Sequence, residues 1–291
     1  MLTRLALLFF LMTLISSPIR AQTTIPVRDP QALTAIASSL KALTGGTTVN
    51  DVILQTTASY VAGSDEESGT ATLTASGNLM SLVQLNLSGG TREEIRSGPA
   101  GVWIGPDGAA HSMFTNNCWT DASWFFPVLT LEAVSANPQL SVSYLGPDTS
   151  KGTPLIHLRV ASVLSGQDPT VTALVTTLST MDLYLGPQSL LPLVLDFNVQ
   201  PDTGISMNVP VEMRFGNFQT VSGVLVPFDI QKYLQGTLLL DFKVANVTVN
   251  SSVPPDTFTL PAIASAANRQ RASKRPSSSA TASRTSTGGG Q

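Results

Sequence analysis

Residues 51–90, DVILQTTASYVAGSDEESGTATLTASGNLMSLVQLNLSGG, decide the fold. Runs rich in apolar and β-branched residues alternate there with short polar stretches, of which SDEESG at 64–69 is the first. In the last run, Val83, Leu85 and Leu87 occupy every second position. A period of two puts apolar side chains on one face of a strand and polar side chains on the other. The stretch therefore predicts an antiparallel meander with a polar turn at 64–69.

The same strand pattern continues to the end of the apolar part of the chain, without the alternation of strand and helix that a parallel sheet requires. No repeat of fixed period is present. We expect roughly ten to eleven strands in all. Beyond the first meander, the strand-like segments are 93–98, 101–105, 112–114, 139–146, 153–164, 181–186, 190–199, 205–221, 224–234, 236–249 and 256–261.

Three helices are expected among these strands. Asp29 and Pro30 form a helix start of N-cap and first helical residue, and apolar residues then recur at steps of three and four until Gly45. Asp168 and Pro169 repeat the same start before the segment that ends near residue 180. A central helix is expected over 127–136, after a turn that Asp121 can cap.

Composition argues against most enzyme classes. Only 12% of the 291 residues are charged, and the chain has one cysteine and two histidines. One cysteine excludes an intramolecular disulfide and a Cys-rich zinc or iron–sulfur site, and two histidines leave little for a His-based metal centre. No G-x-S-x-G, P-loop or G-x-G-x-x-G motif is present in the required context. We therefore expect a protein without catalytic residues, metal or cofactor, in which Cys118 is a buried small hydrophobe.

The first 21 residues are typical of an export signal. Arg4 supplies the positive start, residues 5–15 form an apolar run, and Ser16 begins a polar break. The run is shorter than the roughly 20 residues of a membrane-spanning helix. We expect cleavage after Ala21 and a periplasmic or secreted protein, with an uncleaved anchor as the alternative.

Charge is distributed unevenly along the chain. All 19 acidic residues lie between Asp29 and Asp256, whereas only nine of the 16 basic residues lie between the signal and residue 262. An acidic core with few aromatic residues predicts no nucleic-acid partner. Residues 262–291 are rich in Ser, Ala and Gly, hold five basic residues and no acidic ones, and are expected to be disordered. This tail is either simply solvated or a loose tether to anionic lipid head groups.

The C-terminal third carries the features on which a family resemblance depends. They are the strand pair MDLYLGPQSLLPLVLDF at 181–197, the hairpin SGVLVPFDIQKYLQGTLLLDFKVANV at 222–247, and the ending NSSVPPDTFTLP at 250–261. Together with the positions of the three helices, they resemble the exported lipoprotein-carrier superfamily, the LolA/LolB-like proteins of the bacterial envelope. The resemblance covers most of 22–261. It implies an α+β fold, in which the antiparallel sheet curls into an incomplete (half) barrel covered by the helices.

In such a fold, the apolar faces of the helices lie opposite the inner face of the sheet. The interior between them is either an open cavity or filled with side chains. An open apolar cavity would admit the acyl chain of a lipid or lipoprotein, because each buried methylene gains about 0.8 kcal/mol. A filled interior would be an ordinary close-packed core. For an open cavity, we expect Leu33, Ile36 and Leu40 of the first helix to form one wall.

Two further groups of side chains are candidates for the cavity. Trp119, Trp124, Phe125 and Phe126 form the densest aromatic cluster and either line the cavity mouth or pack in the core. The resemblance implies an arginine near the cavity, which here would be Arg96. The alternative for Arg96 is a surface position paired with Glu93 or Glu94.

Three classes of function are compatible with these expectations. The first is an envelope carrier or sensor of an acyl chain. The second is a non-catalytic scaffold with a filled half-barrel. The third is an exported hydrolase, which requires a serine, a histidine and an acid that converge in the fold.

Overall fold

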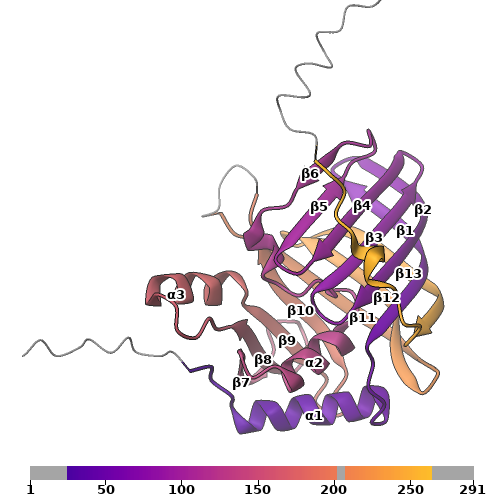
Figure 1. The fold of residues 1–291 in the computed structure, drawn as a ribbon. Helices are drawn as coiled ribbons and strands as arrows, with labels where there is room; N and C mark the ends of the chain where they lie inside the picture. The colour runs from indigo at the N-terminus through magenta and orange to yellow at the C-terminus, as the bar shows by residue number, and fades with distance from the viewer. Residues whose placement is uncertain (1–24, 202–206, 264–291) are drawn as a thin grey trace, which may run out of the picture.

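The computed structural model describes residues 25–201 and 207–263, which form one antiparallel sheet of 13 strands together with three α-helices (Figure 1). The predicted export signal, and the predicted tail from 264 onward, lie outside the described residues. The helices are α1 (Pro30–Thr44), α2 (Pro127–Ala136) and α3 (Pro169–Leu178), and two 3₁₀ turns are η1 (Thr115–Cys118) and η2 (Pro255–Phe258). The strands are β1 (Asp51–Ala62), β2 (Asp65–Ser76), β3 (Met80–Leu87), β4 (Gly90–Ser97), β5 (Ala100–Ile104), β6 (Ala110–Ser112), β7 (Leu140–Asp148), β8 (Leu155–Ser162), β9 (Met181–Leu185), β10 (Pro192–Val199), β11 (Val209–Val221), β12 (Val224–Leu234) and β13 (Thr237–Val249).

The sheet consists of two meanders that meet at its middle. Its strand order is β6-β5-β4-β3-β2-β1-β13-β12-β11-β10-β9-β8-β7, so every neighbouring pair except one is consecutive in the chain. The exception is β1 with β13, where Val52 pairs with Val249. Strands β6 and β7 stand at the two ends, and the sheet is not closed. The predicted α+β fold with an incomplete barrel is confirmed.

The sheet has 13 strands, more than the expected ten to eleven. Short strands are among them: the three residues of β6 pair with β5, beginning two positions before the segment expected at 112–114, and the five residues of β9 pair with both β8 and β10.

Two local predictions are wrong. Of the polar stretch expected as a turn at 64–69, only Ser64 lies in the turn, together with Gly63, whose φ is 67°; residues 65–69 belong to β2, where Asp65 pairs with Ala62. The segment 256–261, expected as a final strand, begins with η2. Prolines 254 and 255 cannot donate to a ladder, and Phe258 instead buries its ring against β3 and β4.

All three helices begin and end close to the predicted residues. Asp29 caps α1 by accepting the N–H groups of Gln31 at 2.7 Å and Ala32 at 3.3 Å. Asp168 caps α3 by accepting the N–H of Thr170 at 2.8 Å. Such caps satisfy N–H groups that have no partner within the helix.

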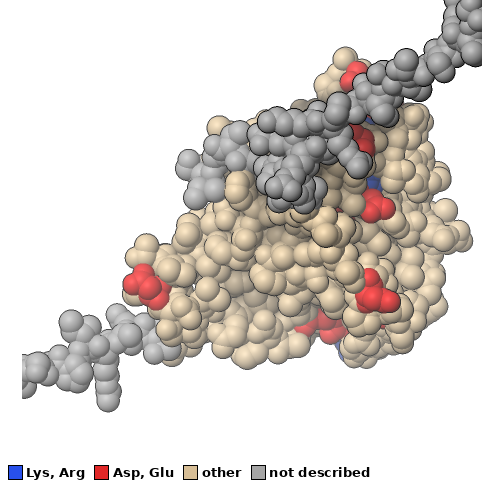
Figure 2. Space-filling model, turned by 45° about the horizontal axis from the view of Figure 1, so that its top comes forward, with Lys and Arg blue, Asp and Glu red and all other residues tan. Residues whose placement is uncertain are grey.

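Helices α1 and α2 fill one part of the sheet's concave side. Helix α1 packs against α2 and against strands β7 and β12, and both helices lie together in Figure 1. Their buried residues join the apolar residues of the strands in one continuous core. Among the described residues, no helix is long and apolar enough to cross a membrane. Charged side chains are few on the face drawn in Figure 2.

Candidate functional site

Strand β4 turns a row of charged side chains toward the concave side of the sheet. In the β3–β4 hairpin, Leu85 pairs with Arg92 and Val83 pairs with Glu94. Paired residues project from the same face of a sheet, and Val83 and Leu85 belong to the core. Arg92, Glu94 and, two residues further, Arg96 therefore point into the interior rather than into solvent.

A cavity of about 270 Å³ lies over this row. Small-molecule sites begin at about 300 Å³, so the cavity suits one chain or one small ligand. Its walls come from β1, β3, β4, β5, β12 and β13 and from the loop before α2. The lining residues are Tyr60, Val83, Leu85, Arg92, Glu93, Glu94, Trp103, Ile104, Gly105, Pro106, Trp124, Lys232 and Leu240. We call this space the concave cavity.

Trp103 stands at the rim of the concave cavity. Its side chain is 40% exposed, although it lines the cavity. The imidazole of His111 on β6 stacks on its ring, with centroids 4.0 Å apart and the planes inclined by 14°. The edge strands thus fix an aromatic wall where the cavity meets solvent.

Lys232 forms part of the floor of the concave cavity. Its Nζ lies 4.2 Å from the ring centroid of Trp124, and the indole N–H of Trp124 donates to Glu94 at 3.4 Å. Burial lowers the pKa of Lys232, the carboxylate of Glu94 opposes this shift, and the guanidinium of Arg96 adds to it. Within the described residues, no carboxylate lies within ion-pair distance of the ammonium group.

Arg96 lies behind Trp124, beside a second hollow of about 60 Å³. This hollow shares Glu94, Trp124 and Lys232 with the concave cavity. The residue is 3% exposed and donates to the carbonyl of Thr120 at 2.7 Å. Its Nε is buried and has no hydrogen-bond partner among the described residues. The alternative of a surface position for Arg96 is therefore wrong.

Arg92 differs from Arg96 and Lys232 because its charge is already compensated. Two of its nitrogens donate to Glu67 at 2.7 and 2.8 Å, and its guanidinium lies 5.0 Å from the ring centroid of Tyr60. The hydrogen bonds from Arg92 lower the pKa of Glu67. Lys232 and Arg96 thus lie near Glu94, and Arg96 also interacts electrostatically with the buried carboxylate of Asp121.

The helix residues proposed for the cavity wall lie elsewhere. Ile36 is buried in the core, and Leu33 and Leu40 pack against that core. None of the three lines the concave cavity. Their stripe is covered because α2 and the strands pack directly against α1.

The four aromatic candidates separate. Trp124 lines both the concave cavity and the smaller hollow, whereas Phe125 and Phe126 are fully buried in the core. Trp119 lines a separate hollow of about 100 Å³. Cys118 is buried, as predicted, and burial raises the pKa of its thiol.

Sequence reasoning missed Glu94, Lys232, Tyr60 and Trp103. The position of Glu94 follows from local sequence. A short turn after Leu87 fixes the register of the β3–β4 hairpin, which places β4 opposite Val83 and Leu85. The position of Lys232 had no such local signal. It depends on the pairing of Lys232 with Leu240 and on a loop more than a hundred residues earlier that supplies Trp124.

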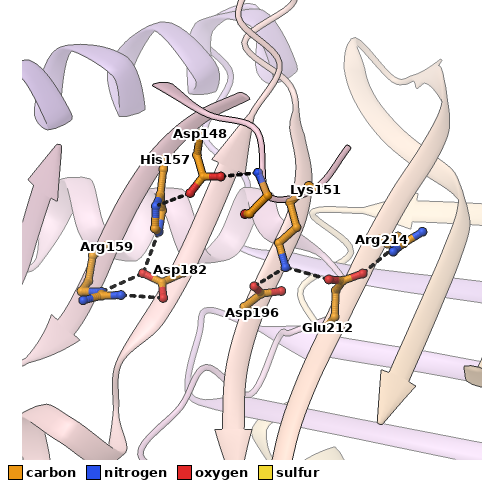
Figure 3. A network of polar contacts seen from close by, with 9 residues as sticks. Asp148, Lys151, His157, Arg159, Asp182, Asp196, Glu212 and Arg214 are labelled. Atoms are coloured by element: carbon orange, nitrogen blue, oxygen red, sulfur yellow. Dashed lines mark hydrogen bonds and ion pairs between the residues drawn. The ribbon is translucent and has the colours of Figure 1, made fainter. Parts of the chain in front are cut away.

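A second cluster of charged residues crosses strands β8–β11 (Figure 3). His157 lies between Asp148, at 3.4 Å, and Asp182, at 2.9 Å, and its ring stacks on Tyr184. Arg159 also donates to Asp182. Burial would raise the pKa of Asp182, but hydrogen bonds from Arg159 and His157 outweigh it and the pKa is lowered.

The other half of this cluster is organised around Lys151. Its ammonium donates to Asp196 and to Glu212, and Arg214 donates to Glu212 at 2.6 Å. Each carboxylate of this cluster contacts at least one basic side chain. Such a network holds neighbouring strands together. Within residues 25–201 and 207–263, no group of three or more His, Cys, Asp or Glu side chains could hold a metal ion.

No family model and no curated protein matches the chain. Solved structures do, at low identity. A putative outer membrane lipoprotein-sorting protein domain from Vibrio parahaemolyticus is 12% identical, with a TM-score of 0.47 over 78% of this chain and 96% of that one. A LolA superfamily protein from Nitrosomonas europaea is 12% identical, with a TM-score of 0.47 over 79% and 97%. A DUF1329 family protein from Desulfovibrio piger is 11% identical, with a TM-score of 0.48 over 81% and 98%.

Proposed function

We propose that the protein binds one acyl chain, of a lipid or a lipoprotein, in the concave cavity. The observation that carries this proposal is an apolar space on the inner face of an open sheet, walled by Val83, Leu85, Ile104 and Leu240. Apolar chains gain free energy when such walls replace water around them. The cavity's volume favours one chain over several.

The proposal places this activity in the bacterial envelope. Residues 1–21 would direct export, residues 22–261 would form the binding domain, and the basic residues of 262–291 would add a loose contact with anionic membrane surfaces. The protein would act as a carrier or sensor and not as an enzyme. The alternative of a scaffold with a filled interior is supported by the packing of α1 and α2, which leaves no open space along the stripe of α1.

Displacement of a fluorescent acyl probe by saturated chains of increasing length tests the proposal. Each added methylene should strengthen binding by about 0.8 kcal/mol, roughly fourfold in Kd, until the cavity is full. Added salt should change these affinities little. Deletion of 262–291 should leave binding of the free chain intact, whereas binding to anionic vesicles should weaken.

A pair of variants on one strand locates the site. Leu85→Trp places an indole in the concave cavity and should weaken probe binding at least about tenfold. Leu87→Trp, on the same strand and the same face but outside the cavity lining, is the matched control and should bind the probe as the wild type does. If the wild type shows no saturable binding, or if Leu85→Trp binds unchanged, the acyl-chain proposal is wrong.

A further inference from the structure

Lys232 forms no ion pair with a carboxylate of the described residues. Lys232 lines the concave cavity together with Trp124 and with Leu240, its partner on β13. The ammonium has the face of Trp124 as its closest partner, at 4.2 Å from the ring centroid. Lys232 is half-buried, and a cation–π contact offsets only part of the hydration free energy that a charged group loses on burial.

Arg96 adds a second donor beside Trp124 and Lys232. Its Nε is buried and unpartnered among the described residues, and the side chain lines the small hollow. Both arginine and lysine offer donors only. Glu94, which lines the same hollow, already accepts from the Trp124 indole. The floor of the site thus holds two cationic donors, of which the Nε of Arg96 has no hydrogen-bond partner among the described residues.

We propose that Lys232 and Arg96 bind the anionic end of the same ligand whose acyl chain lies in the concave cavity. The anion is a carboxylate or a phosphate, either of which can accept from an ammonium and a guanidinium at once. This inference rests on the proposed function and names the ligand's class: an anionic amphiphile with one chain.

The shape of the site agrees with such a ligand. The hollow beside Arg96 measures about 60 Å³, the share of about two water molecules in liquid water. It suits a compact polar group, whereas the adjoining 270 Å³ suits a chain. The two spaces share the side chains of Glu94, Trp124 and Lys232, so a single ligand can occupy both.

Two ligands of equal chain length, dodecanoate and dodecanol, test this inference on the mature protein near neutral pH. The wild type should bind the carboxylate at least about tenfold more tightly than the alcohol, the effect of one charge-assisted contact. Lys232→Met keeps the stem and removes the charge, and should reduce this ratio to within about twofold. Lys243→Met removes a lysine that pairs with Asp229 and Asp241 at the surface, and should leave the ratio unchanged.

Glu94→Gln supplies a change in the opposite direction. It keeps an oxygen that can accept from Trp124 and removes the competing negative charge, so the preference for the carboxylate should rise. This variant also keeps the inference testable if Lys232→Met does not fold. Inorganic phosphate distinguishes a free anion from a head group: it should compete with dodecanoate only weakly, because it lacks the chain.

The outcomes separate the two proposals. If neither dodecanoate nor dodecanol binds, the acyl-chain function fails. If both bind with equal affinity in the wild type, or if Lys232→Met and Glu94→Gln leave the ratio unchanged, the chain site stands and the anion site is wrong. If inorganic phosphate displaces dodecanoate at equal concentration, the site binds a free anion, and the inference that the ligand is an anionic amphiphile is wrong.

Discussion

Arg28 and Val142 form an isolated parallel bridge beside the outermost strand, β7. The N–H of Val142 donates to the carbonyl of Val27 at 2.7 Å, and the N–H of Asp29 donates to the carbonyl of Val142 at 3.0 Å. A free strand edge is a template for pairing with another chain. The segment before α1 therefore covers part of an edge that would otherwise be open.

The side chain of Arg28 ties the same segment to α2. Its Nη1 lies 2.9 Å from each of three carbonyl oxygens, those of Val134, Asn137 and Leu140. Two of these end α2, where a cation also interacts favourably with the helix dipole. Arg28→Ala should lower the free energy of unfolding by about 2–3 kcal/mol, because hydrogen bonds to a charged group are lost. Urea denaturation measures this change, with Lys41→Ala, an exposed position on α1, as the control that should stay within about 0.5 kcal/mol.

Asp168 is predicted to be structural and unrelated to ligand binding. Its carboxylate accepts the N–H of Thr170 at the start of α3, and Asp168→Ala should lower the free energy of unfolding by about 1 kcal/mol. Asp168→Asn keeps a capping oxygen and should lose less. Thermal unfolding measures the loss, and probe displacement should show unchanged affinity. Loss of binding at an unchanged melting temperature would assign Asp168 to a functional site instead.

Asp121 should reduce stability at neutral pH. Burial raises its pKa above 3.8, although the N–H and the hydroxyl of Ser123 donate hydrogen bonds to it at 2.8 and 2.7 Å. The folded state then holds the proton more tightly than the unfolded state, so stability falls as pH rises from 3.8 through the folded pKa. Asp121→Asn keeps an oxygen for the N–H of Ser123 and removes the charge.

Urea midpoints measured from mildly acidic to neutral pH check this expectation. The difference between Asp121→Asn and wild type should grow in favour of the variant as pH rises, and then level off. Asp256→Asn changes an exposed carboxylate and should show no such growth. A wild type that is more stable than Asp121→Asn at neutral pH would contradict the sign.

Ligand binding should depend on pH through Lys232. Burial lowers its pKa from 10.5, and a bound anion would raise that pKa again, so the complex binds the proton more tightly than the free protein. Affinity for dodecanoate, ionised throughout this range, should therefore fall as pH rises above neutrality toward the ordinary lysine pKa. Affinity for dodecanol should stay constant.

Other charged and titratable groups lie near Lys232. Glu93, Glu94, Arg92 and Tyr60 line the same cavity, and Arg96 lines the adjoining hollow. Arg92 stays charged because its pKa is raised by Glu67. Lys232→Met should abolish the pH dependence of dodecanoate binding, and isothermal titration calorimetry at several pH values measures it. A dependence that persists in Lys232→Met would assign the titration to another group.

The parts of the fold that could be predicted are those that depend on local sequence. The starts of α1 and α3 follow from Asp–Pro pairs, since capping involves only residues two or three positions apart. The strands of the first meander follow from period-two alternation in Val83, Leu85 and Leu87. The pattern at 256–261 predicted a strand that does not form. Prolines precede this segment, and the ring of Phe258 is buried from a 3₁₀ turn instead.

The candidate site depends on contacts between distant residues, and most of it could not be predicted. Trp124 and Lys232 come from parts of the chain separated by more than a hundred positions, and only the folded sheet brings them to 4.2 Å. The sequence identified Trp124 among four aromatic residues but offered no way to choose it over Phe125 and Phe126. Arg96 was named from a resemblance, and its burial follows from the register of β3 and β4.

The seam between β1 and β13 has a consequence for the newly made chain. Strand β1 pairs with β2 almost at once, whereas its other edge must wait for β13, roughly 200 residues later. At ordinary rates of synthesis, this takes about 10–40 s. During that interval the β1 edge, apolar at Val52 and Leu54, is open to any other extended segment. The last strand to be made therefore decides whether the two meanders join each other or are lost to aggregation.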